Sequence, residues 1–163
     1  MKSVLAIALA VAAIDQMTKV IVLDRLVLGI PVDVIEGFFN LTLVMNPGLA
    51  FGLLGGMPAA WRWVVAVLSL VALLMLARVA LRVLPTGGWQ GVLGIGFIFG
   101  GALGNLVDRA RFGAVVDFVD VHLRGYHWPA FNVADSAITI GVALLAFRLL
   151  FPGSALAPSR SEG

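Results

Sequence analysis

The chain has 163 residues, of which 61% are hydrophobic and only 12% are charged. A soluble domain usually carries about 25% charged residues, so this composition excludes an ordinary water-soluble enzyme and indicates a protein that lies in a lipid bilayer. The formal net charge is +2 and the basic residues are scattered singly through apolar sequence, which argues against nucleic acid as a partner. The chain has no cysteine and only two histidines, so we expect no disulfide and no metal site.

Four stretches are long and apolar enough to cross a membrane as helices, since a hydrocarbon core of roughly 30 Å takes about 20 helical residues. These stretches are 3–23, 59–77, 88–107 and 133–151. The first could instead be a cleaved signal peptide, because Lys2 precedes an apolar run with small residues. We favour a retained helix, since the apolar run continues past Asp15 and Lys19. The sequence thus predicts one integral membrane domain over residues 1–163, mainly α-helical, with four transmembrane helices.

Two longer connections, 24–58 and 108–132, lie on one side of these predicted helices, and a flexible tail, 152–163, lies on the other. Lysine and arginine are equally numerous on the two sides, so the positive-inside rule alone gives no orientation. Lys2 beside the first helix and two arginines in the shortest loop favour cytoplasmic termini and extracytoplasmic long connections.

Each long connection contains a stretch typical of a β-strand. Apolar and polar residues alternate from Phe39 to Met45, and Asn46-Pro47-Gly48 ends the pattern. The second stretch, 114–121, is rich in valine and phenylalanine. Together they predict a small extracytoplasmic β-sheet that lies on the membrane surface.

Polar residues and glycines within the apolar helices are the next candidates for a structural or functional role. An ionisable side chain at membrane depth costs several kcal/mol unless it is partnered. Asp15 and Lys19 are one helical turn apart and can neutralise each other, which favours a structural role. Gly96, Gly100 and Gly104 form a face without side chains, which predicts close packing against another helix.

A second polar group lies at the end of the third predicted helix. Asn105 is three residues from Asp108 and four from Arg109, so an amide, a carboxylate and a guanidinium share one face. A solvated helix end and a functional cluster both remain open as interpretations of this group.

Two aspartates, Asp117 and Asp135, are the candidates for acid–base catalysis. Asn132 is typical of an N-cap with Asp135 at the third helical position, where the helix dipole favours the ionised carboxylate. Asp117 lies in the extended apolar stretch, with Asp120 on the opposite face. If Asp117 lies close to Asp135 in drier surroundings, the pair would share one proton. The ionised Asp135 would then activate water, and the protonated Asp117 would polarise a carbonyl, as in aspartic proteases.

Five segments, in order along nearly the whole chain, resemble the lipoprotein signal peptidases, or signal peptidase II, a family of bacterial integral-membrane aspartyl peptidases. The segments are Asp15-Gln16 with Lys19, Asn46-Pro47-Gly48-Leu49-Ala50-Phe51, residues 100–105 with Asp108-Arg109, Val116-Asp117-Phe118, and Phe131-Asn132-Val133-Ala134-Asp135. Any one of these segments alone would be a weak signal.

This resemblance implies a four-helix protein of the bacterial inner membrane, with both termini cytoplasmic and an active site near the outer face. It implies that Asp117 and Asp135 are the catalytic pair and that no cofactor is needed. The implied substrate is a lipid-modified prolipoprotein, cut just before a cysteine that bears a diacylglyceryl group. Membrane lipids are further expected partners, and a monomer is expected. The residues that match the family's positions for substrate binding or site support are Asn46, Asn105, Asp108, Arg109, Asn132, Asp15 and Lys19.

Two other functions stay open from the sequence. A small membrane transporter or proton relay would use intramembrane charges such as Asp15, Lys19 and Arg109. It would need ionisable groups across the whole bilayer, and the second predicted helix has none between Trp63 and Ala77. A non-catalytic assembly protein would use the glycine face of the third helix and would tolerate loss of both aspartates.

Overall fold

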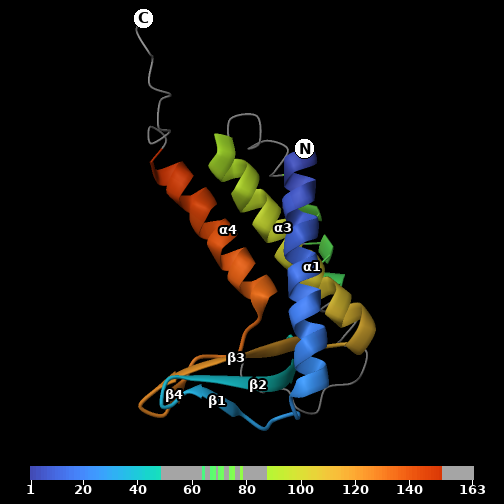
Figure 1. The fold of residues 1–163 in the computed structure, drawn as a ribbon. Coiled ribbons are helices and arrows are strands. Elements are labelled where there is room, and N and C mark those ends of the chain that lie inside the picture. Colours follow the sequence, from blue (N-terminus) through green and yellow to red (C-terminus); the bar gives the residue numbers. More distant parts are fainter. Residues whose placement is uncertain are drawn as a thin grey trace, which may run out of the picture.

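In the computed structural model, the described part of the chain forms three long helices that stand on a small β-sheet (Figure 1). The structure describes residues 1–48 and 88–151, together with isolated helical positions between 64 and 78. The start of α1 and the end of α4 lie at one end of the helix bundle, and the sheet lies at the other (Figure 1). The helices are α1 (Lys2–Arg25), α3 (Gly88–Phe112) and α4 (Val133–Leu150).

These helices confirm three of the four predicted spans, because within the described residues each is long and apolar enough to cross a membrane. The fourth predicted span, 59–77, lies largely outside the described residues, although its described positions are helical. The predicted end of the third helix at 107 is wrong, since α3 continues to Phe112. The charged residues that suggested a loop there are partnered within the bundle: Asp108 is buried and forms an ion pair with Lys19.

The sheet confirms the two predicted extended stretches and adds two short strands. In the described part of the chain its antiparallel strands follow the order β1-β2-β3-β4. A bulge in the register of β2 and β3 lies between Leu41 and Val44. Beyond the bulge, Asn46 pairs with Val115, so the end of β2 lies beside the start of β3. The strands are β1 (Val32–Ile35), β2 (Phe39–Asn46), β3 (Val115–Leu123) and β4 (Tyr126–His127).

Close helix packing depends on the glycines of α3, as the sequence predicts. A Cβ atom added at Gly96 or Gly100 would lie 2.6 Å from an atom of α1. One added at Gly104 would overlap the carboxylate of Asp15, and one at Gly101 would overlap the backbone of α4. Because these faces carry no side chains, α1 and α4 approach α3 closely enough for their polar side chains to meet.

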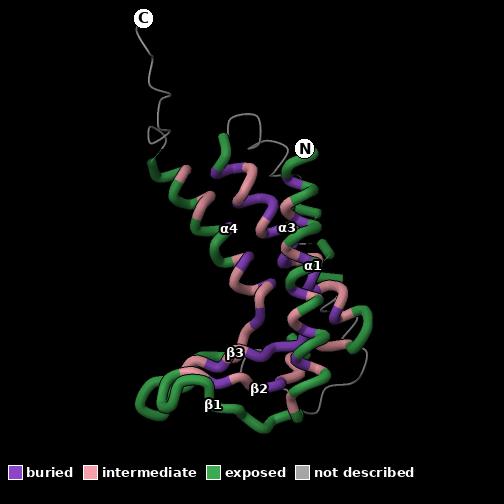
Figure 2. The backbone as a smooth tube through the Cα atoms, in the orientation of Figure 1, coloured by how far each residue is buried: buried purple, intermediate pink, exposed green. Residues whose placement is uncertain are grey.

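The outer faces of the helices are apolar. Figure 2 shows that the exposed positions of α1 and α4 lie on the outside of the bundle. Large apolar side chains occupy them, among them Leu5, which is 61% exposed. Such surfaces suit contact with lipid. A separate apolar core at the junction of α1 with the sheet consists of Val22, Leu43, Val116 and Phe118.

Candidate active site

Buried polar side chains gather where the helices meet the sheet. Lys19 comes from α1, Asn105 and Asp108 from the second half of α3, Asp117 from β3, and Asn132 from the N-cap of α4. All five are buried. Buried polar groups are stable only when they are hydrogen bonded, so their partners define what this cluster can do.

Lys19 is the centre of the inner half of the cluster. Its Nζ lies 2.8 Å from Asp15 Oδ2 and 2.7 Å from Asp108 Oδ2, and it donates to Asn105 Oδ1 at 3.0 Å. An ammonium group has three N–H donors, so each of them has an acceptor here although Lys19 is only 2% exposed. The predicted pair of Asp15 and Lys19 is therefore confirmed, and Asp108 joins it.

The two carboxylates beside Lys19 also hold the backbone next to the candidate catalytic residues. Asp15 Oδ1 accepts from the main-chain N–H of Ala134 at 2.9 Å, in the first turn of α4. Asp108 Oδ2 accepts from the main-chain N–H of Val116 at 3.0 Å, in β3. Ala134 and Val116 directly precede Asp135 and Asp117 in the chain. The buried ion cluster thus fixes the backbone that carries both aspartates.

Asp135 lies in the predicted capping box at the start of α4. Asn132 Oδ1 accepts from the Asp135 N–H at 2.9 Å, and the Asn132 N–H donates to Asp135 Oδ2 at 3.3 Å. The other carboxylate oxygen, Oδ1, accepts from Asn105 Nδ2 at 2.8 Å. The positive end of the helix dipole favours a negative charge at this position.

Asp117 has different surroundings. It is 1% exposed, its Oδ1 accepts from Asn132 Nδ2 at 2.7 Å, and its Oδ2 accepts from Asn46 Nδ2 at 2.9 Å. Burial raises the pKa of Asp117 to about 6, because a charged carboxylate loses its hydration there. The hydrogen bonds from Asn46 and Asn132 oppose this increase, and the negative charge of Asp135 adds to it.

The arrangement therefore holds two carboxylates in unlike environments that share one neighbour, Asn132. Burial raises the proton affinity of Asp117, whereas the helix N-terminus stabilises a negative charge at Asp135. This difference has the direction that an acid and a base in one site require. Arg109 lies within electrostatic range of both Asp117 and Asp135. Its Nη1 donates to the Asn105 carbonyl at 3.3 Å, while its buried Nε has no hydrogen-bond partner among the described residues.

The structure brings the sequence-predicted site residues together, with one further contributor. Gln16 received no role from the sequence, yet its Nε2 donates to Asp108 Oδ1 at 2.9 Å and to the Gly104 carbonyl at 3.1 Å. The sequence signals for Gln16 were its polar side chain in an apolar helix and its place in the Asp15-Gln16 segment that resembles the family. Asp120, expected on the opposite face from Asp117, is also buried but pairs with His127 instead of joining the cluster.

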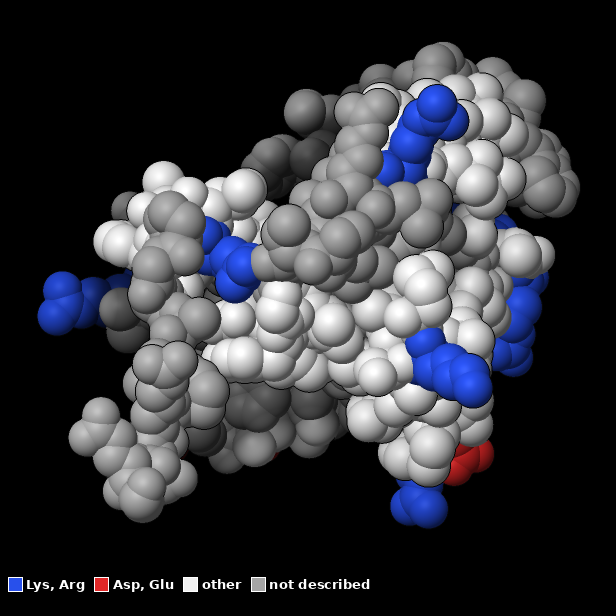
Figure 3. Space-filling view, turned by 90° about the horizontal axis from the view of Figure 1, so that it is seen from above, with Lys and Arg blue, Asp and Glu red and all other residues white. Residues whose placement is uncertain are grey.

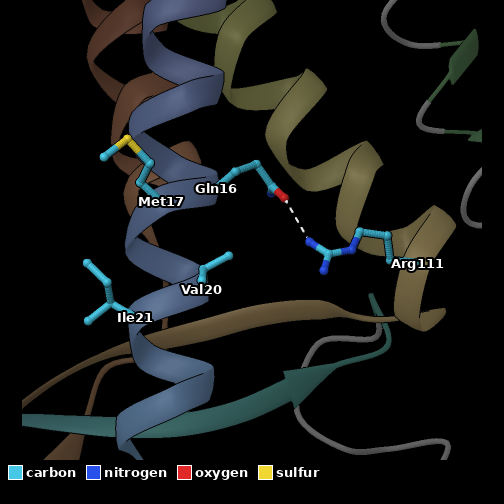
Figure 4. Close-up of a pocket in the computed structure, with 5 residues that line it drawn as sticks. All are labelled: Gln16, Met17, Val20, Ile21 and Arg111. Carbon is cyan, nitrogen blue, oxygen red and sulfur yellow. Dashed lines mark hydrogen bonds between the residues drawn. The ribbon is translucent and has the colours of Figure 1, made fainter.

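A separate pocket lies beside α1 and the end of α3. Figure 4 shows it lined by apolar side chains of α1 together with Gln16 and with Arg111 of α3, whose Nη1 donates to Gln16 Oε1 at 3.5 Å. Neither Asp117 nor Asp135 lines it. This pocket is mostly apolar and lacks both aspartates, so we do not assign acid–base chemistry to it.

The fold and the polar cluster define a helical membrane protein in which two aspartates are hydrogen bonded to the same asparagine, Asn132, at one end of the helix bundle. Comparison with known proteins agrees with this class. Residues 7–151 match the family model Peptidase_A8, described as signal peptidase (SPase) II. The chain therefore belongs to the signal peptidase II family, which makes it an aspartic-type peptidase.

Individual relatives are similar over most of their length. The lipoprotein signal peptidase of Desulforapulum autotrophicum is 51% identical over 148 residues, which cover 86% of this chain and 87% of that protein. The one from Paraburkholderia phytofirmans is 45% identical over 142 residues, or 86% and 80% of the two chains. A solved structure described as a bacterial membrane enzyme is 34% identical, has a TM-score of 0.72, and covers 96% of this chain and 93% of its own.

Proposed function

We propose that Asp117 and Asp135 carry out the reaction of this family on a prolipoprotein, by cutting its signal peptide just before a cysteine that bears a diacylglyceryl group. Family membership supports the reaction, and the relatives named lipoprotein signal peptidases support the substrate class. The observation that carries the assignment of the residues is the shared neighbour Asn132, which bonds to both aspartates while only Asp117 is fully buried.

In the proposed reaction Asp135 is the base and Asp117 is the acid. Asp135 takes a proton from water as the water oxygen bonds to the scissile carbonyl carbon, and Asp117 donates its proton to the carbonyl oxygen. When the tetrahedral intermediate collapses, the carbonyl oxygen returns its proton to Asp117 and the C–N bond breaks. Asp135 then passes its proton to the leaving nitrogen, so both aspartates end in their starting states.

The remaining polar residues position this pair. Asn46 and Asn132 hold Asp117, and Asn105 holds Asp135, through the amide hydrogen bonds described above. The Arg109 Nε is available to bind an oxygen of the substrate, since it has no partner among the described residues. Lys19 neutralises the two carboxylates that fix the backbone and acts at a distance from the substrate.

The protein is proposed to lie in the bacterial inner membrane as a monomer, with cytoplasmic termini and the polar cluster near the outer face. The apolar outer sides of the helices support direct contact with membrane lipids. The face that holds the start of α1 shows mainly basic side chains among its charged residues (Figure 3), with Lys2 in the first turn of α1 and Arg148 in the last turn of α4. Basic residues are typical of the cytoplasmic side.

A transmembrane proton relay receives no support from the described helices. No ionisable residue lies in α1 between Lys2 and Asp15, or in α3 before Asp108. In α4 none lies between Asp135 and Arg148. In the described helices the ionisable residues therefore lie either near the sheet or at the helix ends farthest from it. They form no continuous series across the bilayer.

The test is cleavage of a lipid-modified prolipoprotein by the detergent-purified protein. Asp117→Asn and Asp135→Asn should each abolish detectable cleavage, whereas Asp24→Asn, at an exposed position in the last turn of α1, should leave it unchanged. Cleavage by either of the first two variants at the wild-type rate would contradict the assignment. Orientation is tested by single-cysteine labelling from each side of the membrane, which is straightforward because the chain has no cysteine.

A further inference from the structure

We propose that the tip of the sheet, far from the catalytic pair, binds a divalent transition-metal ion such as Zn²⁺ through Asp120, His122 and His127. One ligand atom from each of these side chains lies within 4.8 Å of those of the other two. Asp120 and His122 are two residues apart on β3 and therefore lie on the same face of the strand. His127 on β4 is the register partner of His122, so all three side chains share one face.

The turn between β3 and β4 fixes this geometry. Arg124 and Gly125 have φ angles of 52° and 83°, which is the pattern of a two-residue type I′ hairpin. In such a hairpin, directly opposed residues have Cβ atoms about 4.5–5.5 Å apart. The rings of His122 and His127 accordingly lie 4.8 Å apart between centroids, with an interplanar angle of 18°. The histidines are thus held beside each other by the backbone before any ligand binds.

The donor set suits zinc. Imidazole nitrogens and carboxylate oxygens bind Zn²⁺ at about 2.0–2.2 Å, and tetrahedral donors then lie roughly 3.4 Å from each other. Asp120 Oδ1 and His127 Nδ1 are already 2.8 Å apart, so modest rotations of the side chains would enclose an ion. Three protein ligands leave the fourth position for water. The side chain of His127 is 55% exposed, which leaves the ion a way in from solvent.

The surroundings of His122 are a second observation that supports a metal ligand role. The Nδ1 of His122 is shielded from solvent and has no hydrogen-bond partner in the described part of the chain. Buried polar atoms without partners are rare and call for an explanation. Ligation through this nitrogen would supply the partner, whereas the ion pair of Asp120 with His127 does not involve it.

The ion would join β3 to β4 and reinforce the outer end of the sheet. In the view of Figure 1 this end projects beyond the helices. Asp120 and Asp117 are three residues apart in an extended strand, so they lie on opposite faces. We therefore expect metal binding to raise the stability of the sheet and to leave peptide cleavage unchanged. The sequence alone indicated no metal site, because the register that sets the two histidines opposite each other is a property of the hairpin.

The experiment is zinc titration of the full-length, metal-free protein, purified in detergent without a histidine tag. We expect one Zn²⁺ per chain by calorimetry and elemental analysis, and no binding of Mg²⁺, which prefers oxygen ligands. His122→Gln, His127→Gln and Asp120→Asn should each weaken zinc binding at least about tenfold. Asp24→Asn, which changes an exposed carboxylate outside the cluster, should not.

Two further measurements keep the test decisive. The chain has two histidines, so an NMR spectrum of the labelled wild-type protein holds the signals of two imidazole rings, and zinc should shift the signals of both rings. Equal thermal unfolding of wild type and variants in EDTA would establish that the variants fold. Binding below one equivalent, unshifted imidazole signals, or full binding by the folded histidine variants would overturn the proposal and leave an ion pair of Asp120 and His127 only.

Discussion

The substitution Asp117→Asn should remove a specific pH dependence of stability. The pKa of Asp117 is raised from 3.8 to about 6 in the folded protein. Between these two values the unfolded chain binds fewer protons than the folded protein, so the free energy of unfolding falls as the pH rises through this window. A shift of about two units corresponds to about 3 kcal/mol. Asparagine does not titrate, so the free energy of unfolding of the variant should not show this decrease as the pH rises.

The measurement is SDS-titrated unfolding, followed by tryptophan fluorescence, at several pH values between 4 and 7.5. Subtracting the variant from the wild type isolates Asp117, since the other carboxylates are common to both. At neutral pH the variant should be as stable as the wild type or slightly more so, because the charge is removed while one hydrogen bond from Asn46 or Asn132, worth about 1–3 kcal/mol, is lost. A difference that stays constant across this pH range would refute the raised pKa.

The same variant separates stability from activity. If Asp117 is the acid of the reaction, Asp117→Asn should lower the cleavage rate at least about 100-fold while the protein stays folded. Asp24→Asn, an exposed exchange of the same kind, should change neither stability nor rate. A variant that is both folded and active would show that Asp117 serves only the structure.

Two further substitutions test the packing beneath the site. Lys19→Met leaves two buried carboxylates without a counter-charge and should cost about 3–5 kcal/mol of unfolding free energy. Arg25→Met, which removes an exposed ion pair, should change it by less than about 1 kcal/mol in the same unfolding assay. Gly104→Ala places a methyl group against Asp15 and should lower the free energy of unfolding by about 1–3 kcal/mol. The thermal unfolding temperature and the cleavage rate should fall together. Gly91→Ala, whose Cβ has no neighbour within 4 Å, should be neutral or stabilising; a loss as large as that of Gly104→Ala would contradict the steric argument.

Local patterns in the sequence were sufficient for several features of the fold and site. Apolar length predicted the described helices, the four-residue spacing of Asp15 and Lys19 predicted their ion pair, and Asn132 with Asp135 predicted the capping box. Each of these depends on residues close together in the chain, where helix geometry fixes the distance. The catalytic roles of the aspartates stay a prediction.

Contacts between segments far apart in the sequence could not be predicted from these local patterns. Nothing in the sequence indicates that Asp15 accepts a hydrogen bond from Ala134, because residue spacing does not say which face of one helix meets the end of another. The same limit explains the wrong end of the third helix. Asp108 and its charged neighbours suggest solvent when their partners in α1 are not visible, and the helix continues because those partners are present.

The hydrogen bonds around Asp117 bear on where its proton would point during the proposed reaction. Both carboxylate oxygens already accept an amide N–H, one from Asn132 and one from Asn46. A protonated Asp117 therefore has no acceptor for its own O–H among these described partners, and the proton is free to face a substrate oxygen. Lys19 and Arg109 supply two positive charges against three other carboxylates of the cluster, so ionising Asp117 as well would add a second uncompensated negative charge. The charge balance thus favours Asp117 as the residue that takes up a proton, with Asp135 accepting one from water, whereas the amide donors of Asn46 and Asn132 act in the opposite direction and keep the pKa of Asp117 from rising further.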